Sequence, residues 1–283
     1  LGPRPRCPAG TRVGGSGRRR APAAELTVRV PASRIDLDAV VERLRVAGCV
    51  AAEDEADVLV GAAPDVDVLD RWLARRELGE PLAWIVGRSR FCGQDVHVAP
   101  GVYVPRWQSE ELAVRGAALL RPRGRAVDLC TGSGAIAVHL AAAVPDATVV
   151  GADIDPLAVA CARRNGVTAV VADLGSAFAP ESFDVLTLVA PYVPRAAMAL
   201  LPPDVRRHEP ALALDGGDDG LDVVRRGVID AGRLLRPGGH LVVEIGGDQL
   251  AAVEAALDVA RFGEVDAWTD DDGDLRGVAA RRR

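Results

Sequence analysis

The sequence predicts an α/β fold in which a doubly wound, mostly parallel sheet of seven strands follows a small helical domain. Three observations indicate this fold. After Arg125, short apolar runs alternate with helical patterns, and a glycine-rich turn follows the first run. Acidic residues also stand at the carboxyl ends of three successive expected strands. Strands that alternate with helices form right-handed crossovers, which give a parallel sheet buried on both faces. Such sheets bind ligands beyond the carboxyl ends of their strands, where the strand order reverses.

The individual elements of the sheet domain follow from the apolar periodicity. We expect helices to begin at Ala135, Pro156 and Leu221, and another to cover residues 107–120. The last two strands are expected to pair as an antiparallel edge. The expected strands are residues 126–129, 148–153, 169–172, 185–189, 240–245, 261–269 and 274–280.

Residues 1–24 carry arginines among proline, glycine and alanine, with no acidic residue before Glu25. Such a segment cannot bury enough apolar surface to offset its ordering entropy, so a disordered tail is expected. The first residue is Leu1 rather than methionine, which favours an upstream extension from a misassigned start codon. An anion-binding arm is the functional alternative.

Residues 25–80 are expected to form a helical domain of about three helices. Ser33 and Asp36 have the spacing of a capping box, and the apolar residues that follow have helical spacing. Residues 81–106 are expected to form a β-hairpin linker to the sheet domain, residues 107–283. The apolar residues behind the hairpin prediction are Trp84, Ile85, Val86, Phe91, Val96, Val98, Val102 and Val104.

Composition narrows the function classes. The net charge of -6 argues against a general polyanion-binding surface, so direct nucleic-acid binding is not expected. Five cysteines without a CxxC pair indicate neither a disulfide framework nor a metal site, and they favour a reducing cytoplasm. No apolar stretch approaches the roughly 20 residues that span a bilayer, so no membrane association is expected.

The glycine-rich turn predicts a nucleoside cofactor. Residues 132–137 fit the dinucleotide fingerprint, and Asp153 lies nineteen residues beyond Gly134. This pattern alone does not separate NAD from S-adenosylmethionine. Asp128 ends the preceding strand, and its charge opposes a diphosphate but suits the ammonium and sulfonium of S-adenosylmethionine. Helix capping is the alternative role of Asp128.

Two more acids follow strands at the same rim. We expect Asp153 to accept hydrogen bonds from both ribose hydroxyls, since an ionised carboxylate only accepts. Its alternative role is the N-cap of the helix that begins at Pro156. Asp173 is expected to accept from the adenine amino group, with Leu174 packed on the ring.

Several stretches between Gly79 and Arg283 carry a family resemblance. They are residues 79–87, 104–106 with Glu110, 189–192 (Val189-Ala190-Pro191-Tyr192), 208–214 and 216–221. Together they resemble the protein-glutamine N5-methyltransferases that modify peptide-chain release factors, whose motif at residues 189–192 would read Asn-Pro-Pro-Tyr. The resemblance implies the Rossmann-like fold of class I methyltransferases, S-adenosylmethionine as cofactor, and a release factor as protein substrate held partly by the helical domain.

The resemblance also implies site residues. In the family, an Asn oxygen and the next backbone carbonyl accept the two hydrogens of the glutamine amide, and Tyr192 would pack against that planar group. The implied amide site is Val189, Ala190, Pro191 and Tyr192. The implied cofactor site is Asp128, Cys130, Thr131, Gly132, Ser133, Gly134, Asp153, Ile154, Asp173, Leu174 and Val189.

This chain departs from the family at Val189 (Asn), Ala190 (the first Pro) and Cys130 (a Gly of the turn). Loss of one preorganised polar group costs on the order of 10²–10³ in rate. Glu209, Thr187 or a water molecule could compensate. Two alternative functions therefore remain: a methyltransferase of the same fold with another acceptor, and a non-catalytic relative. A DNA adenine methyltransferase and a dehydrogenase are less favoured alternatives.

Overall fold

The computed structural model describes residues 35–283, which form two compact units that meet in sequence between Val86 and Gly87. The expected tail, residues 1–24, and the expected cap residue Ser33 lie outside the described residues. No helix among the described residues is long and apolar enough to cross a membrane.

The first unit contains the expected helices. They are α1 (Leu37–Val46), α2 (Ala52–Ala62) and α3 (Val66–Glu77), followed by a short helix, α4 (Leu82–Val86). Asp36 is the N-cap of α1, because its Oδ1 accepts a 3.2 Å hydrogen bond from the backbone N–H of Ala39. Asp65 caps α3 in the same way. The helices bury Leu44, Leu59 and Leu73 in a common core.

The strand expected at Trp84, Ile85 and Val86 is wrong, because these residues belong to α4. A short apolar run does not distinguish a strand from a buried helical turn. Here Pro81 accepts hydrogen bonds from the N–H groups of Trp84 and Ile85, which closes a helical turn. Both side chains are buried.

The β-hairpin that opens the second unit is confirmed. It pairs β1 (Arg88–Phe91) with β2 (Gln94–His97). Cys92 and Gly93 connect them with φ of 47° and 75°, the positive values that two-residue hairpin turns require. Val98, Val102 and Val104 were expected in strands, yet they follow the hairpin without regular secondary structure, and they are buried.

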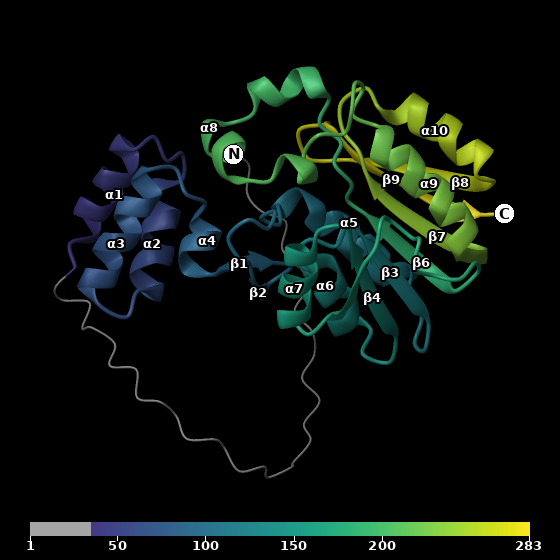
Figure 1. Cartoon of the computed structure of the whole chain (residues 1–283), viewed down its shortest axis with the longest axis horizontal. Helices are drawn as coiled ribbons and strands as arrows, with labels where there is room; N and C mark the ends of the chain where they lie inside the picture. Colours follow the sequence, from purple (N-terminus) through teal and green to yellow (C-terminus); the bar gives the residue numbers. More distant parts are fainter. Residues whose placement is uncertain (1–34) are drawn as a thin grey trace, which may run out of the picture. The chain divides into compact units, whose positions relative to one another are not determined.

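The second unit contains a seven-stranded sheet with the order β5-β4-β3-β6-β7-β9-β8. The first five strands in this order run parallel, and β9 and β8 add the expected antiparallel edge. The strands are β3 (Arg125–Leu129), β4 (Thr148–Asp153), β5 (Thr168–Val171), β6 (Phe183–Leu188), β7 (Leu235–Glu244), β8 (Phe262–Thr269) and β9 (Leu275–Arg282). This is the doubly wound α/β fold that the sequence predicts (Figure 1).

Helices and shorter turns connect these strands. The α-helices are α5 (Glu110–Leu119), α6 (Ala135–Ala143), α7 (Pro156–Arg164), α8 (Pro203–His208), α9 (Asp222–Leu234) and α10 (Leu250–Val259). The 3-10 turns are η2 (Trp107–Ser109), η3 (Arg195–Leu200) and η4 (Ala211–Ala213). The expected starts at Ala135 and Pro156 are confirmed, and α9 begins one residue after Leu221.

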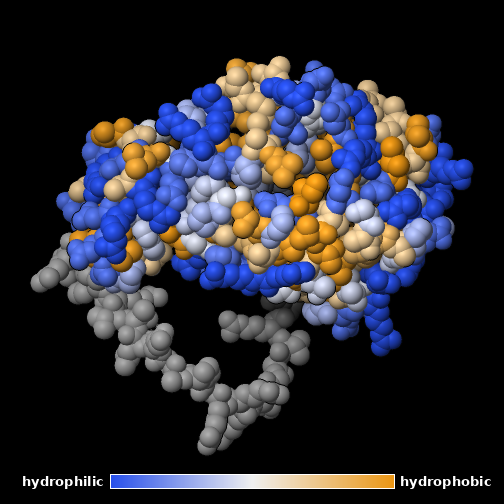
Figure 2. Space-filling model, in the orientation of Figure 1, coloured by the Kyte–Doolittle hydropathy of each residue, from blue (hydrophilic) through white to orange (hydrophobic). Residues whose placement is uncertain are grey.

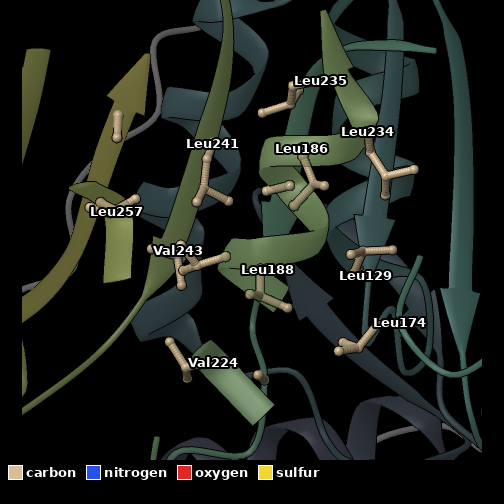
Figure 3. Packing of buried hydrophobic residues seen from close by; sticks show 14 of the residues in the cluster. Leu129, Leu174, Leu186, Leu188, Val224, Leu234, Leu235, Leu241, Val243 and Leu257 are labelled. Carbon is tan, nitrogen blue, oxygen red and sulfur yellow. The ribbon is translucent and has the colours of Figure 1, made fainter. Parts of the chain in front are cut away.

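The central strands send alternate side chains into two apolar layers, as strand geometry requires. On β6, Val185 packs in the layer that contains residues of α5 and α6, while Leu186 and Leu188 pack in the layer that contains residues of α9 and α10. Figure 3 shows Leu129 and Val224 in the second layer. Both faces of the sheet are therefore covered.

The outer surface mixes polar and apolar residues. Figure 2 shows hydrophilic residues over much of the visible face, with smaller apolar groups among them. Exposed large apolar residues include Trp107, Ile154, Leu200 and Leu212. Single exposed apolar residues are ordinary on folded proteins.

The strand order reverses between β3 and β6, because β4 and β5 extend from one side of β3 while β6 and β7 extend from the other. The segments that follow β3 and β6 therefore leave the same rim of the sheet side by side. Ligands bind at this position in open α/β sheets.

Candidate active site

The turn after β3 depends on residues with positive φ. Cys130, Gly132 and Gly134 have φ of 57°, 55° and 82°. A Cβ on Gly134 would lie 3.0 Å from the Cβ of Ala162, so glycine there also permits the close approach of α6 to α7. Cys130 adopts a left-handed conformation that costs a side-chain-bearing residue about 1–2 kcal/mol.

Asp128 lies beneath this turn. Its carboxylate accepts hydrogen bonds from Thr131 Oγ1 at 2.6 Å and from Thr187 Oγ1 at 2.7 Å. The side chain is buried, and burial raises the pKa of Asp128 to about 6 despite these bonds. Asp128 does not line the cavity described below, and its hydrogen bond with Thr131 holds the turn that does contribute to the lining.

Asp153 stands at the end of β4 and faces the same turn. Its Oδ2 accepts from the N–H of Gly132 at 2.8 Å, and its Oδ1 accepts from the N–H of Asp155 at 2.9 Å. Burial raises its pKa. The alternative role of Asp153 as a helix cap is excluded, because Asp155 caps α7 by accepting from the N–H of Leu157 at 2.8 Å.

A cavity of about 660 Å³ opens at this rim. Thr131, Ser133 and Gly134, like Asp128, shape the turn but do not line it. The expected residues that do line it are Cys130, Gly132, Asp153, Ile154, Asp173, Leu174, Val189, Ala190, Pro191 and Tyr192. The cavity therefore brings the expected cofactor residues and the expected amide site into one continuous space.

The electrostatic field of the cavity is negative near Cys130. Burial raises the pKa of the Cys130 thiol most, and the nearby carboxylates of Asp153, Asp128 and Asp173 raise it further. The same field that disfavours a thiolate favours a cation. The residues present therefore fit the ammonium and sulfonium of S-adenosylmethionine and oppose a diphosphate.

The far end of the expected cofactor site carries an ion pair that the sequence did not predict. Arg226 of α9 donates a 2.6 Å hydrogen bond to Asp173 Oδ2, and both residues line the cavity and are about half exposed. Leu174 is buried and has a φ of 48°. Asp173 and Leu174 thus stand side by side at the wall, with one carboxylate oxygen of Asp173 already engaged.

The expected amide site begins where β6 ends. Val189 offers only an apolar side chain to the cavity, and it packs against the layer that contains Leu112 and Ala113 of α5. Tyr192 also lines the cavity, and its hydroxyl donates to Glu244, which accepts from Ser109 as well. Burial raises the pKa of Glu244 and of Tyr192.

Glu244 contacts Tyr192 but was not predicted from the sequence, although its position at the end of a strand could have indicated it. Glu244 is the last residue of β7, so it repeats the pattern of an acid at the carboxyl end of a strand. Tyr103, Arg106, Gln108 and Arg276 line the cavity and were also missed. They lie outside the turn and the motif, and only the tertiary fold brings them there.

Two of the alternatives that could compensate for the missing Asn, Thr187 and Glu209, have other partners. Thr187 is fully buried, does not line the cavity and donates to Asp128, which excludes this alternative. Glu209 pairs with Arg106, whose guanidinium lies 5.2 Å from the centre of the Tyr103 ring. Glu209 does not line the cavity, but Arg106 and Tyr103 do.

Comparisons with known proteins agree with this geometry. Residues 126–207 match the model of a methyltransferase domain. A release factor glutamine methyltransferase from Geobacter sulfurreducens is 42% identical over 207 residues, which cover 71% of this chain and 72% of the relative. A 4-amino-L-phenylalanine/4-methylamino-L-phenylalanine methyltransferase from Streptomyces pristinaespiralis is 37% identical over 260 residues, which cover 81% of this chain and 88% of the relative.

A solved structure supports the fold. The Mtq2-Trm112 complex of E. cuniculi, which is responsible for methylation of the eRF1 translation termination factor, contains a chain that aligns with a TM-score of 0.50 and 23% identity. The alignment covers 65% of this chain and 99% of that chain. This likeness shows the same fold.

The fold, the turn and the negatively charged cavity define a class I methyltransferase that uses S-adenosylmethionine. Within that class, the identity and coverage of its relatives place the chain in one family. The chain belongs to the release factor glutamine methyltransferase family.

Proposed function

We propose that this protein methylates the side-chain nitrogen of a glutamine in a peptide-chain release factor. The observation that carries the proposal is the cavity itself, in which the cofactor wall at Cys130 and Asp153 continues into Val189 and Tyr192 at the switch point of the sheet. Residues 189–192, which correspond to the family motif for the glutamine amide, line this cavity and support the proposal. Because release factors act on ribosomes, the proposed location is the cytoplasm.

S-adenosylmethionine, when bound, supplies a methyl group on a positively charged sulfur. Transfer forms a nitrogen–carbon bond as the sulfur–carbon bond breaks, sulfur keeps the electron pair, and the nitrogen releases one proton to water. The protein contributes alignment of the two reacting atoms, about 3–3.5 Å apart. Backbone carbonyls at Val189 and Ala190 are available to accept from the amide, and the Tyr192 ring offers a flat surface beside it.

The test is methyl transfer to an intact release factor. The purified protein is incubated with S-adenosylmethionine that carries a labelled methyl group and with a release factor that contains a Gly-Gly-Gln loop. Peptide mass spectrometry is expected to find one added methyl group on that glutamine. A release factor with glutamate in place of the glutamine is the control. No label on the glutamine, under conditions in which the protein binds S-adenosylhomocysteine, contradicts the proposal.

A second candidate acceptor is the amino group of a small aromatic amine. The relative from Streptomyces pristinaespiralis acts on such a compound by its name, and its match covers more of both chains than the Geobacter match does. An aromatic amine keeps more of its nitrogen lone pair than an amide does, so it depends less on a polar group at Val189. Leu201, Val205 and Leu212 add apolar wall to the cavity. Transfer to 4-amino-L-phenylalanine in the same assay distinguishes the two acceptors.

A further inference from the structure

Three buried oxygen atoms near the cavity lack a hydrogen-bond partner. They are Gln108 Oε1, Glu209 Oε2 and Glu244 Oε2, and within residues 35–283 no other buried side-chain oxygen is unpartnered. A buried acceptor without a donor costs about 1–3 kcal/mol, so proteins rarely retain one without a reason. All three atoms accept hydrogen bonds. A group that satisfies any of them must therefore carry an N–H or O–H donor.

Of these three residues, Gln108 alone lines the cavity. It belongs to η2, the turn that leads into α5. The next residue, Ser109, donates to Glu244, and Glu244 also accepts from Tyr192. Gln108 is thus one residue from a hydrogen-bonded chain that ends at the last residue of the expected amide site.

Gln108 and Val189 line the same cavity. Val189 offers it an apolar side chain, whereas Gln108 carries a carboxamide whose oxygen has no hydrogen-bond partner. Of the two residues, Gln108 is therefore the one with a side-chain acceptor for a hydrogen bond.

We propose that Gln108 Oε1 accepts a hydrogen bond from the nitrogen that receives the methyl group, in place of the Asn that this chain lacks at Val189. This inference rests on the proposed methyl transfer to nitrogen. A carboxamide oxygen at Gln108 offers the same acceptor chemistry as an Asn side chain, but from another position in the cavity lining. It orients the nitrogen lone pair toward the methyl group and holds the N–H whose positive character grows during transfer.

The test uses three variants and one matched control. Gln108→Leu removes the acceptor at similar size, and Gln108→Glu keeps an oxygen. Gln108→Leu combined with Val189→Asn places the acceptor where the family has it. Gln94→Leu is the control, because Gln94 is a partly buried glutamine on β2 that does not line the cavity. Calorimetric titration with S-adenosylhomocysteine checks that each variant keeps its cofactor site.

Gln108→Leu is expected to lower kcat about tenfold to a hundredfold, since one oriented hydrogen bond to the reacting group is lost. Its affinity for S-adenosylhomocysteine is expected to stay within about twofold, because Gln108 touches the acceptor rather than the cofactor. Gln108→Glu is expected to keep more activity than Gln108→Leu. Adding Val189→Asn to Gln108→Leu is expected to restore most of the loss, which a merely structural role of Gln108 does not predict.

The possible results distinguish the inference about Gln108 from the proposed function. If Gln108→Leu leaves kcat unchanged on a release factor, the inference is overturned and the proposed function stands. If the unaltered protein methylates only 4-amino-L-phenylalanine and Gln108→Leu lowers that rate, the inference stands and the proposed acceptor is overturned. If the unaltered protein binds S-adenosylhomocysteine but methylates neither acceptor, both are overturned.

Discussion

Thr187 donates a 2.7 Å hydrogen bond to Asp128, its direct neighbour on the adjacent parallel strand. Asp128 precedes the glycine-rich turn, and Thr187 precedes Val189 by two residues. Both side chains are buried at the point where the strand order reverses. This bond therefore ties the cofactor turn to the segment that is expected to hold the methyl acceptor.

Replacing Thr187 with valine is expected to destabilise the protein at neutral pH. The change keeps the shape of the side chain but leaves a buried carboxylate with one donor fewer, and hydrogen bonds to charged groups contribute about 1.5–3 kcal/mol. Urea unfolding at pH 7.5 is expected to show a loss of this size. Thr148→Val, at an exposed threonine of β4, is the control and is expected to change the free energy of unfolding by less than about 0.5 kcal/mol. Equal losses in both variants would argue against the role of the bond.

The raised pKa of Asp128 is expected to make the free energy of unfolding depend on pH. Its pKa in the folded protein, about 6, lies above the usual value of 3.8. The stability that this group contributes is therefore present below pH 3.8 and is lost as pH rises through about 6. Asp128→Asn does not titrate at this position, so the unfolding free energy of the unaltered protein is expected to fall relative to the variant by about 2 kcal/mol between pH 4 and pH 7.5. A constant difference across that range would contradict the raised pKa.

Much of the sheet domain was predictable because parallel buried strands are apolar on both faces and therefore form recognisable runs. The same apolar pattern predicted where β3 and β4 end, and Asp153 at the end of β4 lines the cavity as expected. Trp84 was misassigned because a run of three apolar residues has no measurable period. Local pattern thus located the rim of the sheet, but it failed at α4, whose five residues are too few to show a helical period.

Contacts between residues far apart in the chain could not be predicted from the sequence. Thr187 was a candidate for the cavity, but strand register directs its hydroxyl to Asp128 instead. Ser109, next to Gln108 in η2, and Glu244 at the end of β7 are far apart in the chain and share a hydrogen bond only in the folded protein. No spacing rule connects such residues before the topology is known.

Asp153 is expected to be the strongest single determinant of cofactor affinity. Asp153→Ala leaves the N–H groups of Gly132 and Asp155 without their acceptor and removes the carboxylate from the cavity wall. We expect S-adenosylhomocysteine to bind roughly tenfold to a hundredfold more weakly, as measured by calorimetry. Asp65→Ala, which removes the helix cap of α3 in the other unit, is the control and is expected to leave this affinity unchanged. Unchanged affinity in Asp153→Ala would remove Asp153 from the cofactor site.

Cys130 allows a test of the strain in the turn. At ordinary sites glycine is less favourable than alanine by roughly 0.5–1 kcal/mol, because glycine loses more backbone entropy on folding. At Cys130 the φ of 57° reverses the preference, since any residue with a Cβ bears a cost of about 1–2 kcal/mol there. Cys130→Gly is therefore expected to be more stable to urea than Cys130→Ala by up to about 1 kcal/mol. Ala142→Gly, at an exposed position of α6, is expected to show the opposite sign. If Cys130→Ala is the more stable of the two, the strain at Cys130 is relieved elsewhere and the turn does not demand glycine.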